Sequence, residues 1–311
     1  DWTPDTDNTS GKLQIGEGSE FITALKTKEE ILVWTDVSLH SVRYIADPFT
    51  FGIRTIATNI NIVGPGAKIE ADNVVYWMGK QNFFMYSGRV QTLPCSVQSY
   101  IFDDINLNQL LKVKAGINGS EDEVIWHYPS SGSGENDRYV IYNFRLKIWY
   151  FGSFNSAGRT AWIDRSHDNF PVAAGTDGYL YFHENGFDDG STTPVTAINP
   201  FIESSDMEAG DGEKFIFFKR ILPDISFNGS TAASPTATIT LTPRNFQGEA
   251  YGTARTAIIT STGTSPTELH TKQAHIRFRA REYKYKMESN QVGVKWVQGT
   301  PRLEGRQDGR K

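Results

Sequence analysis

The chain has 311 residues and a net charge of −5, a balance that argues against tight, non-specific nucleic-acid binding by the chain as a whole. Aromatic residues make up 13% of the sequence, and 28 Gly and 13 Pro are spread through it, which favours short strands and tight turns. The single cysteine, Cys95, excludes an intrachain disulfide and is expected to be a small buried residue. No apolar run is long enough to span a membrane, so we expect no membrane insertion by this chain.

Four hairpins are predicted in the first part of the chain, each made of an apolar strand, a polar turn and a second apolar strand. Every turn contains Asp, Asn or Gly, which adopt turn conformations at low cost. The predicted hairpins cover residues 31–45, 74–86, 139–151 and 172–182.

Tryptophans occupy equivalent places in this pattern. Trp34 and Trp77 lie 43 residues apart (77 minus 34), and Trp126 follows 49 residues later (126 minus 77). A four-stranded propeller blade takes roughly 40 to 50 residues. We therefore expect a domain of β-propeller-like hairpin blades over residues 1–195, although the spacing shortens further along the chain. A β-sandwich with hairpins is the alternative.

Helical signal is confined to one short stretch. Asp103 and Asp104 precede apolar residues at positions 107, 110 and 111, which predicts a capped short helix or a turn over residues 103–111. Residues 130–136 are rich in Ser and Gly and are expected to form a hairpin loop.

The composition changes after residue 191, where Thr, Ser and Pro become frequent and the hairpin repeat ends. We place a domain boundary near residue 195. Longer strands are predicted over residues 214–222, 237–242 and 275–281, the last two with period-two alternation. Residues 196–311 are therefore expected to form a smaller β-sandwich-like domain with a basic tail, and the fold class is all-β.

No pattern of catalytic or metal-binding residues stands out. The six histidines lack ligand spacing, the paired aspartates at 103–104 and 188–189 lack the further oxygen ligands of a calcium loop, and no nucleophile elbow or phosphate-binding loop is present. We expect no catalytic residue, no cofactor and no bound metal, and therefore no enzyme.

The clearest charge pattern lies near the end of the chain. Over residues 276–281 arginines alternate with apolar residues, which predicts one buried and one basic strand face. Lys284 and Lys286 have the opposite phase, which implies a β-bulge near residues 281–282 if they join the same surface. The expected basic surface at a subunit interface comprises Arg277, Arg279, Arg281, Lys284, Lys286, Arg302, Arg306 and Arg310.

Two interpretations of this basic surface remain open. The first is a solvated strand face followed by a solvated tail. The second is contact with an acidic neighbouring subunit or, less often, with DNA.

A set of short stretches that together span nearly the whole chain carries a resemblance to known proteins. It comprises Gly16–Leu25, Glu30–Trp34, Thr92–Ser96, Ile101–Asn106, Asp137–Tyr142, Trp149, Arg159–Trp162, Gly299–Arg302 and Asp308–Arg310. These stretches look like a family of virion structural proteins from tailed bacteriophages. More distantly, this family resembles the tail hub or nozzle proteins of short-tailed phages, also called packaged-DNA stabilisation proteins.

The resemblance implies a structural subunit of the virion tail that is assembled in the host cytoplasm. It implies a homo-hexameric ring below the portal and adaptor, around a DNA exit channel, that helps to retain the packaged genome. The implied partners are identical subunits, the portal-adaptor and other tail proteins, and double-stranded DNA that passes without sequence-specific binding. The family supplies no catalytic residues. Nozzle proteins are about twice as long, so we expect this chain to be the later part of a larger propeller.

A DNA conduit needs rigid walls without strongly attractive contacts to phosphate, because such contacts hinder sliding. We therefore expect the basic surface to face a neighbouring subunit or the adaptor. One rival function is a carbohydrate-binding or carbohydrate-cleaving propeller at the tail tip. Another is a capsid or tail-decoration protein without a channel role.

Overall fold

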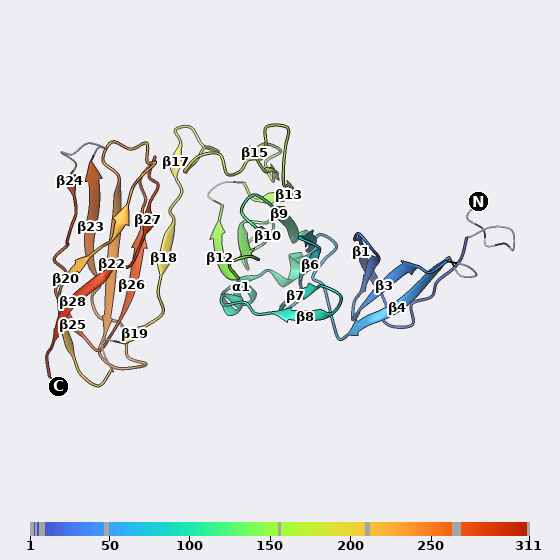
Figure 1. The fold of residues 1–311 in the computed structure, drawn as a ribbon, viewed down its shortest axis with the longest axis horizontal. Coiled ribbons are helices and arrows are strands. Elements are labelled where there is room, and N and C mark those ends of the chain that lie inside the picture. Colours follow the sequence, from blue (N-terminus) through green and yellow to red (C-terminus); the bar gives the residue numbers. More distant parts are fainter. Residues whose placement is uncertain are drawn as a thin grey trace. The chain divides into compact units, whose positions relative to one another are not determined.

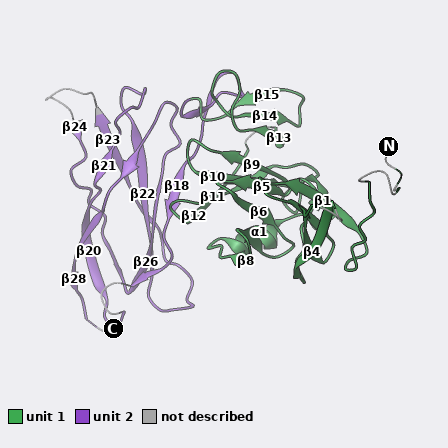
Figure 2. Cartoon of the chain, turned by 45° about the vertical axis from the view of Figure 1, so that its right-hand side comes forward, with its two compact units in different colours: residues 1–185 green, residues 186–311 purple. Residues whose placement is uncertain are grey.

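The computed structural model describes residues 3, 5, 10–46, 50–154, 157–208, 212–262 and 269–309. Strands make up 47% of it and helices 5%, so the expected all-β class is confirmed (Figure 1). The chain divides into two compact units, residues 1–185 (unit 1) and 186–311 (unit 2), which Figure 2 colours separately.

Unit 1 contains four antiparallel sheets in which neighbouring strands follow one another along the chain. The first sheet has β1 (Phe21–Lys26), β2 (Ile31–Thr35), β3 (Ser38–Tyr44) and β4 (Phe51–Thr58). The second has β5 (Lys68–Ala71), β6 (Val74–Met78), β7 (Phe83–Tyr86) and β8 (Val90–Leu93). The third has β9 (Lys114–Asn118), β10 (Glu123–Tyr128), β11 (Arg138–Asn143) and β12 (Ile148–Ser153). The fourth has three strands, β13 (Arg159–Ile163), β14 (Val172–Gly175) and β15 (Leu180–Phe182).

All four predicted hairpins are confirmed, as the pairs β2–β3, β6–β7, β11–β12 and β14–β15. The turn residues follow from backbone sterics: Lys147 and Gly178 lie at φ 58° and 87°, where glycine is favoured and most other residues are strained. The predicted loop over residues 130–136 is confirmed between β10 and β11.

The equivalence of Trp34, Trp77 and Trp126 is also confirmed. Each lies in the second strand of a four-stranded sheet, and none of the three is exposed. The rings of Trp34 and Trp77 meet edge to face across two sheets, with 5.5 Å between centroids. Such aromatic side chains bury large apolar areas, so they supply much of the stability of unit 1.

The first strands of successive sheets are neighbours. Lys68 on β5 donates to the Thr23 hydroxyl on β1 over 2.6 Å. Next to β5, the carbonyl oxygen of Gly66 accepts a 2.7 Å hydrogen bond from the Ala115 amide on β9. Trp162 on β13 donates through Nε1 to a carbonyl oxygen of β9. No closed propeller or barrel is detected in the described part of the chain, and the propeller-like organisation stays a prediction.

The short helix predicted over residues 103–111 is confirmed in part. A 3-10 helix over Leu107–Lys112 contains the predicted apolar positions, and helix α1 (Gln98–Asp104), which was not predicted, precedes it. The cap of the 3-10 helix is Asn106, whose side chain accepts from the Asn108 amide, so the predicted aspartate cap is wrong. Cys95 is half-buried and packs against the apolar core of unit 1, so its predicted burial is confirmed only in part.

Unit 2 has two larger sheets and two short strand pairs. The six-stranded sheet contains β18 (Phe201–Glu203), β19 (Met207–Glu208), β22 (Thr236–Arg244), β23 (Arg255–Thr262), β24 (Leu269–His270) and β26 (Glu282–Glu288). The three-stranded sheet has the order β25 (Phe278–Ala280), β20 (Ile216–Leu222) and β28 (Arg302–Gln307). The short pairs are β16 (Asp188–Asp189) with β17 (Thr196–Ala197) and β21 (Ile225–Ser226) with β27 (Val297–Gln298).

The two larger sheets of unit 2 lie face to face across one apolar cluster. Ile239 and Met287 from the six-stranded sheet and Phe218 and Phe278 from the three-stranded sheet belong to this cluster. The rings of Phe218 and Phe278 stack with centroids 4.6 Å apart. Each sheet therefore has one buried face and one outer face.

The division between the units falls ten residues before the expected boundary (195 minus 185). The pair β16–β17 accounts for the difference, because it belongs to unit 2. Both carboxylate oxygens of Asp188 accept from the Gly293 amide at 2.9 Å, which ties this pair to unit 2.

Candidate interaction surface

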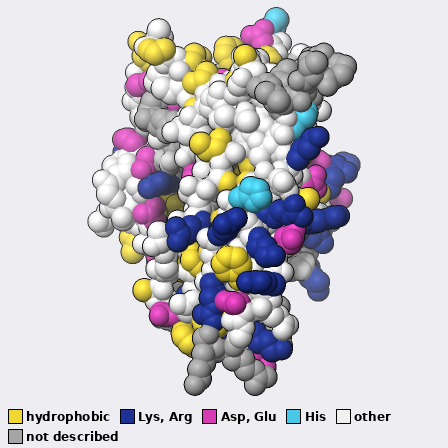
Figure 3. Space-filling view, turned by 90° about the vertical axis from the view of Figure 1, so that its left-hand side faces the viewer, with side chains coloured by type: hydrophobic (Ala, Val, Ile, Leu, Met, Phe, Trp, Pro, Cys, Tyr) yellow, Lys and Arg dark blue, Asp and Glu magenta, His cyan; other side chains and the backbone are white. Residues whose placement is uncertain are grey.

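The outer face of the three-stranded sheet in unit 2 carries a concentration of arginine. We call it the basic face and define it by Arg220, Arg277, Arg279, Arg302 and Arg306. Figure 3 views the side on which β20, β25 and β28 lie, and dark-blue Lys and Arg side chains gather across it.

Strand register explains why these arginines share a face. Phe217 on β20 is opposite Arg279 on one side and Arg306 on the other, so the three form a row across the sheet. The alternate residues Ile276, Phe278 and Ala280 are buried, which confirms the predicted alternation.

Two of the arginines are held by carboxylates within the face. Arg279 forms a 2.8 Å ion pair with Asp308, and its guanidinium lies 3.7 Å from the ring centroid of Phe215. Arg220 pairs with Glu304 at 2.5 Å. These contacts fix both side chains and partly neutralise the sheet.

Arg277, Arg302 and Arg306 are exposed, and none of them forms an ion pair with another described residue. The guanidinium of Arg306 lies 5.9 Å from the ring centroid of Phe217. The attraction between the cation and the ring favours an Arg306 side chain that lies over the outer face of the sheet. Three arginines without an ion-pair partner on one sheet face attract an anionic surface, because guanidinium groups bind carboxylates and phosphates through paired hydrogen bonds.

Of the other predicted members of the basic surface, Arg281 lies beside the basic face, because its guanidinium covers the same Phe215 ring as that of Arg279, whereas Lys284 and Lys286 lie elsewhere. At Arg281 the chain bends and passes from the three-stranded to the six-stranded sheet, so the predicted bulge at 281–282 is wrong. Lys284 and Lys286 therefore lie on the outer face of the other sheet, where Lys286 pairs with Glu288 at 2.7 Å. Arg281 packs over the rings of Phe215 and Phe246. Arg310 lies outside the described residues.

A buried carboxylate joins the first two sheets of unit 1. The side chain of Glu30 is 6% exposed and accepts hydrogen bonds from Ser41, from Arg43 at 2.8 Å and from the Tyr86 hydroxyl at 2.6 Å. Burial alone raises the pKa of Glu30, but these donors outweigh it and lower the pKa to about 2. No short sequence pattern indicates this site, because Glu30 and Tyr86 are 56 residues apart.

A hollow of about 490 Å³ lies beside Glu30, with Glu29, Glu70 and Asn73 among its lining residues. Among the described residues that line it, Tyr86 is the only aromatic one and is 4% exposed. Sugar-binding clefts commonly present an accessible aromatic face together with polar groups. This hollow offers carboxylates without such a face.

His127 on β10 is fully buried, and neither ring nitrogen has a hydrogen-bond partner within the described chain. Burial lowers the pKa of His127 to about 3, with smaller contributions from His183 and Arg159. Burial and Arg159 lower the pKa of His183 to about 4. Arg159 donates through Nε to His183 over 3.0 Å. Both imidazoles are therefore neutral near pH 7, packed among the rings of Phe154 and Trp162.

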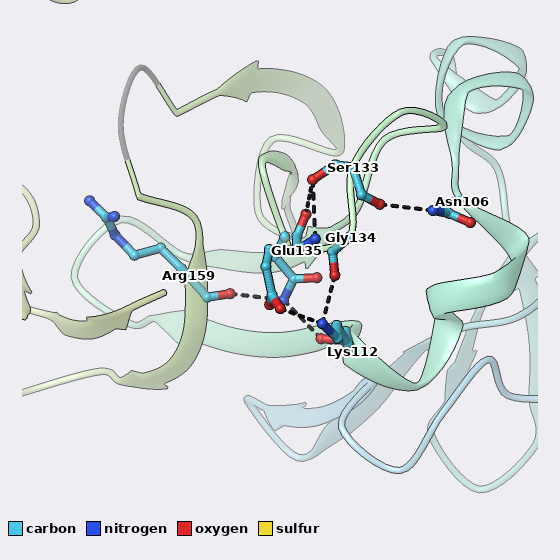
Figure 4. A network of polar contacts seen from close by, with 7 residues as sticks. Asn106, Lys112, Ser133, Gly134, Glu135 and Arg159 are labelled. Carbon is cyan, nitrogen blue, oxygen red and sulfur yellow. Dashed lines mark hydrogen bonds and ion pairs between the residues drawn. The ribbon is translucent and has the colours of Figure 1, made fainter. Parts of the chain in front are cut away.

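Backbone carbonyl groups anchor the loop over residues 130–136 to its surroundings (Figure 4). Asn136 donates to the carbonyl oxygens of Lys112 and Arg159 at 2.8 Å each. Lys112 donates to the Gly134 carbonyl oxygen at 2.6 Å and pairs with Glu135. These hydrogen bonds hold the loop against β13, and we interpret the loop as a structural element.

Among the described residues, no group of three or more His, Cys, Asp or Glu side chains is arranged to hold a metal ion. No helix in the described part of the chain is long and apolar enough to cross a membrane.

Comparison with known proteins supplies no family. The chain matches no model of a protein family, and no curated protein is significantly similar to it.

Proposed function

We propose that the chain is a structural component of a bacteriophage tail, a nozzle or hub subunit that forms a ring below the portal and adaptor. In this proposal the ring surrounds the DNA exit channel and helps to retain the packaged genome. The chain acts in the virion and performs no catalysis. The resemblance of its sequence motifs to virion structural proteins supports the proposal.

The structural observation that carries the proposal is the succession of sheets in unit 1. Four antiparallel meanders follow one another, and the first strands β1, β5, β9 and β13 are neighbours in that order. Propeller blades are arranged in this way, with their first strands innermost. We therefore interpret unit 1 as propeller-like and unit 2, with two facing sheets, as sandwich-like.

This architecture suits the wall of a conduit. The second strands β2, β6 and β10 are buried over most of their length, so the sheets support one another on both faces. Interiors packed in this way resist deformation. The wall then remains rigid while DNA passes.

The alternative is a carbohydrate-binding or carbohydrate-cleaving propeller at the tail tip. It requires exposed aromatic rings beside carboxylates in one cleft. The hollow beside Glu30 has the carboxylates, but its aromatic residue Tyr86 is buried. The observations therefore favour the structural proposal over the glycan-binding one.

Electron microscopy of the purified protein tests the proposal. We expect ring-shaped particles of uniform diameter with a central hole, and six-fold symmetry in their class averages. Monomers at every concentration, or open filaments alone, would contradict the ring.

Retention of double-stranded DNA provides a second test. We expect weak retention by the assembled protein at low salt, because a conduit must release its cargo. Tight binding that falls steeply with added salt would show instead that arginines face the DNA.

A further inference from the structure

Charge is divided unequally between the two units. Residues 1–185 contain 15 basic and 22 acidic side chains, whereas residues 186–311 contain 16 and 14, so the net charge of −5 divides into −7 and +2. Opposite net charges favour the approach of unit 1 of one molecule to unit 2 of another.

The excess negative charge of unit 1 includes an unneutralised cluster, which we call the acidic cluster and define by Glu121, Glu123 and Glu184. Glu121 lies in the turn before β10, Glu123 begins β10, and Glu184 follows β15. None of the three pairs with Lys or Arg within the described chain, and the polar partner of Glu123 is the Asn118 amide at 3.4 Å.

Glu123 and Glu184 of the acidic cluster ionise less readily than ordinary glutamates. Burial, then the charges of Glu184 and Glu121, raise the pKa of Glu123 to about 7. Burial and Glu121 also raise the pKa of Glu184. A cation placed beside these groups relieves the repulsion, so the cluster has a free-energy reason to accept an arginine from outside.

Apolar surface adjoins both charged regions. Strand β15 forms a free edge of its sheet in the described chain and exposes 72% of Leu180 and 52% of Phe182, just before Glu184. On the basic face, Leu222 is 39% exposed and is opposite Arg302 in the register of the sheet. Burying such residues adds affinity that exposed ion pairs alone do not provide.

We propose that the basic face of one molecule binds the acidic cluster of a second copy, with Arg277, Arg302 and Arg306 against Glu121, Glu123 and Glu184. The two surfaces differ, so the contact is head to tail and repeats from one copy to the next, as in a closed ring. The inference rests on the proposed ring function and identifies the partner of the basic face.

Charge reversal on each side tests this pairing. The first variant carries Arg277→Glu, Arg302→Glu and Arg306→Glu, and the second carries Glu121→Lys and Glu184→Lys. Each is measured by sedimentation velocity alone and in an equimolar mixture. A control with Lys26→Glu, Lys80→Glu and Lys147→Glu has the same charge change as the first variant at exposed positions of unit 1. Circular dichroism establishes that each variant is folded.

We expect the wild type and the control to form the same assembly and each reversed variant alone to sediment as a monomer. The mixture should assemble again, because the reversed faces are complementary to each other and the unchanged faces retain their native pairing. Wild-type association should also weaken as pH falls from 8 to 6, because docking favours the ionised form of Glu123, whose pKa in the free chain is about 7.

The possible failures are distinguishable. If both reversed variants assemble like the wild type while electron micrographs show rings, the ring proposal stands and the pairing is wrong. If the wild type is monomeric throughout, both fail. If the wild type binds a 30-base-pair duplex tightly and only the first variant loses this binding, the basic face is a DNA surface and the pairing is again wrong.

Discussion

The two units use antiparallel hairpins in different ways. In unit 1 strands β2, β6 and β10 are buried on both faces over most of their length, and Trp34, Trp77 and Trp126 fill the space between sheets. In unit 2 the strands alternate, as in β22, where every second residue over Ala237–Leu241 is buried. Both faces of a stacked sheet are therefore buried and stabilise the fold, whereas each of two facing sheets keeps one outer face that can carry charged side chains.

The two units also differ in the role of their charged residues: some stabilise the fold, and others are available to bind a partner. Glu30 of unit 1 lies inside the packing and accepts three side-chain hydrogen bonds. Arg302 and Arg306 of unit 2 lie outside it. Substitutions in the first group should change stability, and substitutions in the second should change association.

Trp126→Ala is expected to reduce stability the most. The indole is fully buried and donates to the Ala67 carbonyl oxygen at 3.0 Å. We expect the free energy of unfolding of unit 1 to fall by about 3 to 5 kcal/mol, because a large cavity opens in the core. Denaturant unfolding measures the loss, with Ile239→Val in unit 2 as the control at about 0.5 to 1.5 kcal/mol. A loss below about 1 kcal/mol would contradict the aromatic core.

Glu30→Gln should remove a pH-dependent part of stability. The pKa of Glu30 is about 2 in the folded chain against 4.5 in its ordinary range, so its ionised form stabilises the fold above pH 4.5. This contribution, about 3 kcal/mol, is lost as pH falls through 2. Urea unfolding from pH 7 to 2 should show a shallower fall for Glu30→Gln than for the wild type. Parallel profiles would mean that the carboxylate contributes nothing.

His127→Leu should change the pH dependence of stability in a different pH range. The pKa of His127 is about 3 in the folded chain against 6.5 in its ordinary range, so the unfolded chain takes up the proton first. As pH falls from 6.5 to about 3, this group should lower the free energy of unfolding of the wild type by about 1.4 kcal/mol per pH unit. The variant should lack this decrease between pH 6.5 and 5, a window in which Glu30 does not titrate. His183→Leu should remove a similar loss of unfolding free energy between pH 6.5 and 5, because the folded-state pKa of His183, about 4, also lies below this window.

The smallest effect on stability is expected for Arg302→Ala combined with Arg306→Ala. Both side chains are exposed and make no ion pair with another described residue, so the free energy of unfolding should change by less than about 0.5 kcal/mol. Association should weaken all the same. A clear loss of stability would place these arginines in the fold rather than at an interface.

The sequence predicted the hairpins because their signals are local: an apolar run, a turn residue and a second apolar run lie within about 15 residues. It predicted the alternation over residues 276–281 for the same reason. The sheet change at Arg281 was missed, because no turn residue marks it and both flanking strands continue at once.

The acidic cluster and the Glu30 site could not be predicted in this way. Glu184 joins Glu121 and Glu123 only when the fourth sheet packs beside the third, and Tyr86 reaches Glu30 from another sheet. Long-range packing creates both sites, and no short window of sequence contains it.

In the proposed assembly, copies of this chain associate through complementary charges. Sedimentation equilibrium of the wild type at about 0.05 and 0.5 M salt is the decisive experiment, because added salt screens ion pairs between exposed groups. We expect one closed assembly of several copies at low salt that dissociates toward the monomer at high salt. A monomer under both conditions would contradict it.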